Sequence, residues 1–148
     1  MDSLLRISEA ASLALHAMLV LSTRAEERLS TREIAQTLGG SEAHLSKVLQ
    51  RLVKAGFVCS TPGRNGGFAL PEGKGDPSLL EVYEVIEGRL APVKCLLGKP
   101  ICGGKCILGD LVATLNAEVK QHLGKTRISD LRNTYGSRKG GTKKDHSH

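Results

Sequence analysis

The chain has 148 residues and a formal net charge of +6 at pH 7, with 21 Lys and Arg against 15 Asp and Glu. This length fits one compact domain with an appendage and a real hydrophobic core. The modest positive charge is compatible with a polyanionic partner such as nucleic acid. Aromatic residues make up 3% of the chain and Trp is absent, which disfavours stacking on single-stranded bases and favours duplex DNA over RNA.

Charged residues interrupt the apolar positions near the N-terminus, so neither a signal peptide nor a membrane span is expected. We therefore expect a cytoplasmic protein without a membrane partner. In a reducing cytosol the four cysteines are expected to be thiols or metal ligands rather than disulfides.

Composition and periodicity divide the chain into consecutive parts and predict a mostly α-helical fold with a small β-hairpin wing. A first helix at 8–24, capped by Ser8, is expected to cover the motif that follows it. A linker rich in Gly and Pro precedes the next part. The predicted parts are a winged helix-turn-helix DNA-binding domain at 1–75, a short helix and cysteine loop as sensor at 76–106, a dimerisation helix and short terminal helix at 107–135, and a disordered basic tail at 136–148.

Two short helices followed by a hairpin predict the winged helix-turn-helix, a DNA-reading module. Ser30 and Glu33 have the spacing of a capping box at the start of the first helix. After a Gly-Gly break, Ser41 caps the second helix, whose apolar residues recur at helical spacing. The wing strands are predicted at 57–60 and 68–70.

The second helix is the expected reading helix, because an α-helix fits the major groove of DNA. Its first turns would meet base edges, and the wing tip would reach the backbone or the minor groove. An amphipathic helix with a basic face also occurs in protein-binding modules, so an interaction adaptor stays open as an alternative. The candidate DNA-binding residues are Glu42, His44, Ser46, Lys47 and Arg51 on the helix, and Arg64 and Asn65 at the wing tip.

A long loop at 89–105 has no secondary-structure signal, which is typical of functional or disordered segments. Cys95, Cys102 and Cys106 lie in or beside it, among glycines that allow close approach of the thiols. Cys106 immediately precedes a helix expected from Ile107, whose N-terminal amides would favour a thiolate. Soft thiolates select an iron–sulfur cluster or zinc. Both normally take four ligands, so one ligand must come from elsewhere.

Three helices complete the predicted structure. Ser78 is expected to cap a short helix at 79–87, and Thr126 a last short helix at 127–133. Between them, apolar residues at 107–123 recur every three or four positions. Such a helix most simply buries its apolar stripe against the same helix of a second subunit in a homodimer. The alternative is that it folds back on its own domain.

This order of parts resembles the Rrf-two family of winged-helix transcription regulators. The resemblance covers residues from about 5 to 133 and is carried by PGRNGGFAL, by LLEVYEVIEG and by the cysteine loop. It implies a homodimeric transcription regulator joined by the long helix, and not an enzyme. Two-fold symmetry further predicts an inverted-repeat operator in double-stranded DNA. Repression is the expected outcome when such a dimer covers a promoter.

Iron–sulfur-binding members of that family hold a [2Fe-2S] or [4Fe-4S] cluster with three loop cysteines, which match Cys95, Cys102 and Cys106. Some members take a fourth, acidic ligand from the first helix of the partner subunit, and Glu9 occupies the matching place. The resemblance thus implies a cluster that controls DNA affinity in response to redox, nitric oxide or iron–sulfur status. The spacing between the last two cysteines is shorter than usual, and Gly109 replaces a His that other members use. A structural zinc, or no metal in this loop, is the alternative.

Overall fold

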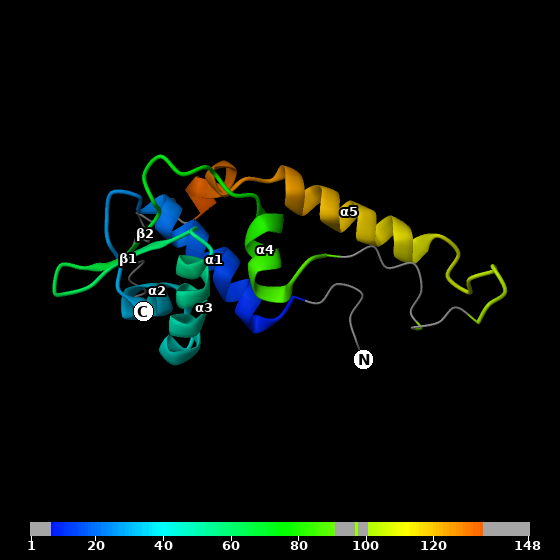
Figure 1. Cartoon of the computed structure of the whole chain (residues 1–148), viewed down its shortest axis with the longest axis horizontal. Helices are drawn as coiled ribbons and strands as arrows, with labels where there is room; N and C mark the ends of the chain where they lie inside the picture. Colours follow the sequence, from blue (N-terminus) through cyan, green and yellow to red (C-terminus); the bar gives the residue numbers. More distant parts are fainter. Residues whose placement is uncertain (1–6, 91–96, 98–100, 135–148) are drawn as a thin grey trace, which may run out of the picture.

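The computed structural model of the chain describes residues 7–90, 97 and 101–134 (Figure 1). Helices dominate this part of the chain, and its sheet is a small antiparallel hairpin, so the predicted fold class is confirmed. Among the described residues, none of the helices is long and apolar enough to span a bilayer. The elements are α1 (Glu9–Thr23), α2 (Thr31–Leu38), α3 (Glu42–Lys54), β1 (Cys59–Thr61), β2 (Gly67–Ala69), α4 (Leu79–Glu87), α5 (Leu111–Lys125) and the 3-10 helix η1 (Ile128–Thr134).

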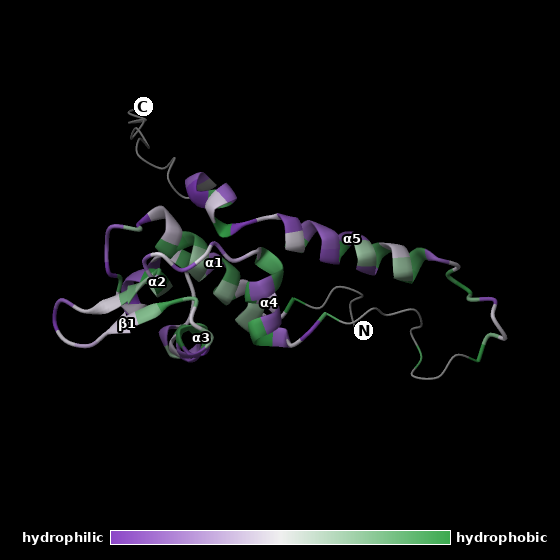
Figure 2. Ribbon diagram, turned by 45° about the horizontal axis from the view of Figure 1, so that its top comes forward, coloured by the Kyte–Doolittle hydropathy of each residue, from purple (hydrophilic) through white to green (hydrophobic). Residues whose placement is uncertain are grey.

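Helix α1 lies at the centre of the fold, in contact with α2, α3, α4 and η1. It is apolar on most sides, which is the pattern of a helix surrounded by protein (Figure 2). Met18 and Leu21 are among its fully buried side chains. At its start, the side chain of Ser8 accepts a hydrogen bond from the Ala11 amide at 3.1 Å, so the predicted cap is confirmed.

The helix-turn-helix forms as its caps predict. The Glu33 amide donates to Ser30 Oγ at 3.1 Å, and the Ser30 amide donates to the Glu33 carboxylate at 2.7 Å. Gly39 then takes a left-handed conformation at φ 67°, which ends α2 and turns the chain towards α3. Ser41 caps α3 by accepting from the His44 amide at 3.3 Å. Leu49 on the inner face of α3 is completely buried in the core.

The first wing strand begins two residues later and is one residue shorter than predicted, and the second begins one residue earlier. Its strands pair at Cys59↔Ala69, Ser60↔Phe68 and Thr61↔Gly67, whereas the sequence suggested strands beginning at 57 and 68. The reason lies at the end of α3, where the Phe57 amide donates to the Leu52 carbonyl at 3.0 Å. Phe57 therefore belongs to the termination of α3, and the first strand starts after it.

In the C-terminal part the prediction of α4 is confirmed, whereas the start of α5, the Thr126 cap and the bounds of the last helix are wrong. Helix α4 has the predicted bounds and a capping box at Ser78. Helix α5, however, begins at Leu111 and not at Ile107, because residues 102–109 form turns that include Gly109 at φ 57°. Thr126 does not cap the last helix, since its hydroxyl donates back to the His122 carbonyl at 2.9 Å.

The last helix is a 3-10 helix rather than an α-helix. It begins at Ile128. At its start the Asp130 carboxylate accepts a hydrogen bond from the Arg127 amide at 2.9 Å, in place of the cap predicted from Thr126. Through Ile128, which is buried, η1 packs against α1. Helix α5 packs against α4, and its N-terminal end extends away from the body of the domain (Figure 1).

Candidate nucleic-acid interface and cysteine site

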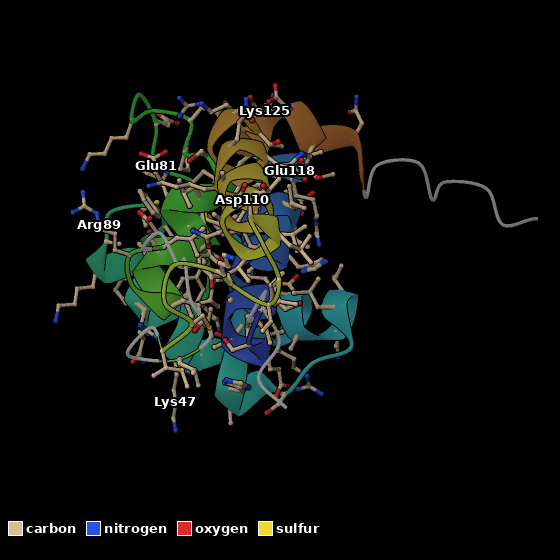
Figure 3. The ribbon with its side chains drawn as sticks, turned by 90° about the vertical axis from the view of Figure 1, so that its right-hand side faces the viewer. Lys47, Glu81, Arg89, Asp110, Glu118 and Lys125 are labelled. Atoms are coloured by element: carbon tan, nitrogen blue, oxygen red, sulfur yellow. The ribbon has the colours of Figure 1, made fainter. Side chains whose placement is uncertain are left out.

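The predicted reading residues lie on the face of α3 that points away from the core. Glu42 and Lys47 are exposed, while His44 and Ser46 are half-buried. Lys47 projects from the body of the domain into solvent (Figure 3). The core side of the same helix is held by fully buried leucines, so the outer face is rigidly presented.

His44 lies beside the predicted fourth cluster ligand. Its Nδ1 atom is 3.5 Å from Glu9 Oε1, and the two side chains are 35% and 71% exposed. The sequence assigned these residues to different roles, one to DNA and one to a metal. The structure therefore joins the first turn of α1 to the first turn of α3, a contact that no sequence spacing indicated.

Arg51 is engaged by α4. Its Nη2 atom donates to the carbonyl oxygens of Val85 at 3.0 Å and Ile86 at 2.8 Å. The predicted contact of Arg51 with DNA stays a prediction, but its guanidinium already has partners within the chain. Sequence reasoning missed this role, because only the packing of α3 across α4 reveals it.

The wing tip exposes Arg64 and Asn65, the remaining predicted DNA contacts. Glycines are required to form the turn beneath them. A Cβ atom at Gly66 would lie 2.0 Å from the Thr61 carbonyl oxygen, and one at Gly67 would lie 2.7 Å from the Leu29 carbonyl oxygen. The sequence PGRNGG thus folds into a tight hairpin that points two polar side chains outward.

Cys102 and Cys106 are half-buried, reduced thiols in a run of turns. The Lys105 amide donates to the Cys102 carbonyl at 3.1 Å, and the glycines between them have φ angles of 57° and 85°. The Leu108 amide lies 3.4 Å from Cys106 Sγ and donates to it. Hydrogen bonds from amides to cysteine sulfur are a regular feature of iron–sulfur sites.

The prediction that the N-terminus of the long helix faces Cys106 is wrong. Cys106 does not immediately precede the long helix, since residues 107–110 separate it from α5. The amide of Leu108, in the turn, takes the place that the sequence gave to the helix N-terminus. Asp110 is the N-cap residue of α5 and makes no side-chain capping bond there.

The complete predicted ligand set cannot be assembled from the described residues, because Cys95 lies outside them. Within the described part of the chain, no three His, Cys, Asp or Glu side chains converge on a common metal position. The donor chemistry nevertheless fits an iron–sulfur cluster or zinc. Cys102 and Cys106 are thiols in one glycine-rich turn, and one of them already receives an amide hydrogen bond.

The comparison with known families settles the class of protein. A family model named Rrf2, described as an iron-dependent transcriptional regulator, matches residues 7–134. The chain belongs to the Rrf2 family. The family and its described relatives are transcriptional regulators, not enzymes.

Individual relatives agree with this assignment. The chain is 36% identical over 106 residues to the regulator NsrR of Bacillus licheniformis, covering 64% of this chain and 72% of that protein. It is 33% identical over 91 residues to protein aau3 of Rhizobium meliloti, covering 62% and 59%. The chain spans 55–63% of the length of several curated relatives that it matches.

Solved structures show the same fold. CymR of B. subtilis, described as the global cysteine regulator, superposes with a TM-score of 0.73 at 28% identity, covering 88% of this chain and 98% of that one. IscR of T. potens superposes with a TM-score of 0.69 at 21% identity, covering 92% and 93%. The winged-helix fold of the Rrf2 regulators is therefore the fold of this chain.

Proposed function

We propose that this chain is a homodimeric, DNA-binding transcription repressor of the cytoplasm whose operator affinity is set by an iron–sulfur cluster. The observation that carries the proposal is the pair of thiols, Cys102 and Cys106, in one glycine-rich turn of an Rrf2-family chain. The Leu108 amide already donates a hydrogen bond to Cys106 Sγ, and hydrogen bonds to sulfur are a regular feature of iron–sulfur sites. With Cys95, these residues complete the three-thiol set.

The DNA-reading part of the proposal rests on the outer face of α3. Its first turns carry side chains that can reach base edges in a major groove, and the wing carries two that can reach phosphates or the minor groove. A symmetric dimer would place its reading helices about 34–36 Å apart, or a multiple of this, on an inverted repeat. The proposed contacts are Glu42, His44, Ser46, Lys47, Arg64 and Asn65.

The dimer part of the proposal rests on apolar side chains along and before α5. Leu111 is 48% exposed and Leu115 is 37% exposed, and Ile107 just before the helix is 87% exposed. Exposed apolar residues in a row, on a helix that extends from its domain, favour an interface with a second copy. The same helix anchors its C-terminal end through Leu123, which packs against the domain core.

The sensing part of the proposal assigns ligands. The thiols of Cys95, Cys102 and Cys106 would hold the cluster, and Glu9 of the partner subunit would supply a weak, exchangeable oxygen. A bound cluster supplies a centre that reacts with oxidants and nitric oxide. It can change DNA affinity only if it binds one arrangement of the chain better than another. Since the Glu9 carboxylate lies 3.5 Å from His44 on the reading helix, its use as a ligand would alter that helix directly.

Anaerobic purification followed by iron, sulfide and zinc analysis tests the proposal. We expect a brown protein with thiolate-to-iron absorption that binds a defined promoter fragment, and whose affinity changes when the cluster is removed. A colourless protein holding stoichiometric zinc would indicate a structural metal site. A metal-free protein with the same affinity under every redox condition would refute cluster sensing.

A second candidate is a winged-helix regulator or interaction adaptor with zinc or no metal in the loop. The likeness to CymR favours it, because CymR is described as a regulator of cysteine and its description names no iron. The same metal analysis separates the two candidates.

A further inference from the structure

Arg51 of the reading helix holds the C-terminal end of α4. The last carbonyls of an α-helix have no partner within the helix. Arg51 Nη2 donates to two of them, Val85 O at 3.0 Å and Ile86 O at 2.8 Å. The sequence of α4 contains no Lys or Arg, so the positive charge that stabilises this helix end is supplied by α3.

Other contacts fix the same end of α4 to its surroundings. The Ser8 hydroxyl, at the start of α1, donates to the Glu87 carboxylate. The Gly88 amide donates to the Glu84 carbonyl at 2.9 Å, and the Leu90 amide donates to the Glu84 carboxylate at 3.1 Å. The end of α4 is therefore an anchored point, and Arg51 adds two hydrogen bonds to the apolar packing that joins α3 to α4.

The position of Arg51 along α3 decides what it can do. It lies in the last turn of the helix, about 6 Å along the axis from Lys47 and farther from the N-terminal residues proposed to read bases. A guanidinium that spans two carbonyls restrains the angle of the helix more than a single contact does. We propose that Arg51 is a positioning residue, which sets the orientation of the reading helix on α4 and thereby its sequence-specific DNA binding, without itself contacting DNA.

The inference rests on DNA binding by this chain but not on the cluster. The test first selects a duplex from a random-sequence library with the wild-type chain. It then measures the affinity of wild type, Arg51→Ala, Arg51→Lys and Lys47→Ala for that duplex and for a scrambled one, over a range of salt concentrations. Amide hydrogen exchange at Gly88 and Leu90 is followed in each variant, and circular dichroism checks that each is folded.

Loss of both carbonyl contacts in Arg51→Ala is expected to weaken binding to the selected duplex about tenfold. Scrambled-duplex affinity and the salt slope should stay as in wild type, and exchange at Gly88 and Leu90 should accelerate. Arg51→Lys keeps the charge but reaches fewer acceptors, so its affinity for the selected duplex should lie between those of wild type and Arg51→Ala. Lys47→Ala removes a proposed DNA contact, so it should lower the affinity for the selected duplex and the salt slope, with unchanged exchange at Gly88 and Leu90.

Three results would overturn the inference. If Arg51→Ala lowers affinity for both duplexes and reduces the salt slope by about 0.9, Arg51 is a phosphate contact. If Arg51→Ala or Arg51→Lys binds and exchanges like wild type, the α4 contact does not position the helix. A wild-type chain that selects no duplex would remove the DNA-binding function itself, and this inference with it.

Discussion

Leu111→Ala tests the dimer through the exposed side of α5. Leu111 is 48% exposed in the single chain, and the substitution removes three carbon groups worth about 0.8 kcal/mol each when buried. Because about half of the side chain is still exposed, a partner subunit could bury about half of it, which is worth about 1.2 kcal/mol of binding free energy per protomer. In a symmetric interface both copies lose it, so the dimer should weaken by about 2.4 kcal/mol, or about 50-fold in its dissociation constant.

Sedimentation velocity over a concentration series measures this change. Lys120→Gln is the matched control, because Lys120 is exposed on another face of the same helix and its substitution should leave the dissociation constant unchanged. A Leu111→Ala chain that dimerises as tightly as wild type would refute the assignment of this face. A wild-type chain that is monomeric at all concentrations would refute the dimer.

Three further predictions concern the loop, the wing and α2. Cys102→Ala should lose iron while its far-ultraviolet circular dichroism is unchanged; iron retained at the wild-type ratio would contradict its assignment as a ligand. Gly66→Ala places a Cβ atom 2.0 Å from the Thr61 carbonyl oxygen, so the chain should lose about 1–3 kcal/mol of stability in urea unfolding; a wild-type midpoint would show that the turn adapts freely. Hydrogen bonds from Ser30 hold the pKa of Glu33 below its ordinary value. The stability that these hydrogen bonds contribute is therefore present above the unfolded pKa and is lost as pH falls through the folded pKa. Glu33→Gln should therefore flatten the acid limb of the stability curve, and overlapping acid limbs would contradict this.

Local signals in the sequence predicted most of the helices. Ser30, Ser41 and Ser78 each cap a helix as expected, because a capping bond joins residues three positions apart and is visible in the sequence. The start of α5 was misplaced because apolar periodicity continues through Ile107, although Gly109 takes a left-handed conformation. Periodicity records which side chains are apolar, and it does not record where the backbone turns.

The candidate site was predictable in its residue types but not in its connections. A basic helix, a glycine-rich wing and clustered cysteines are sequence patterns, and together they indicate the class of protein. The contacts of Arg51 with α4 and of His44 with Glu9 join residues more than thirty positions apart. Such contacts depend on how helices pack, which charge and spacing in one sequence do not determine.

The contact between Glu9 and His44 connects the two halves of the proposed function. In the proposed mechanism, a Glu9 carboxylate that binds the cluster would give up its contact with His44 in the first turn of the reading helix. If DNA binding also changed this contact, DNA and cluster would each alter the other's affinity by the same factor, because coupling free energies are reciprocal. If Glu9 is a cluster ligand as proposed, the 3.5 Å separation of these two atoms would link the sensor to the reading helix through one side-chain contact.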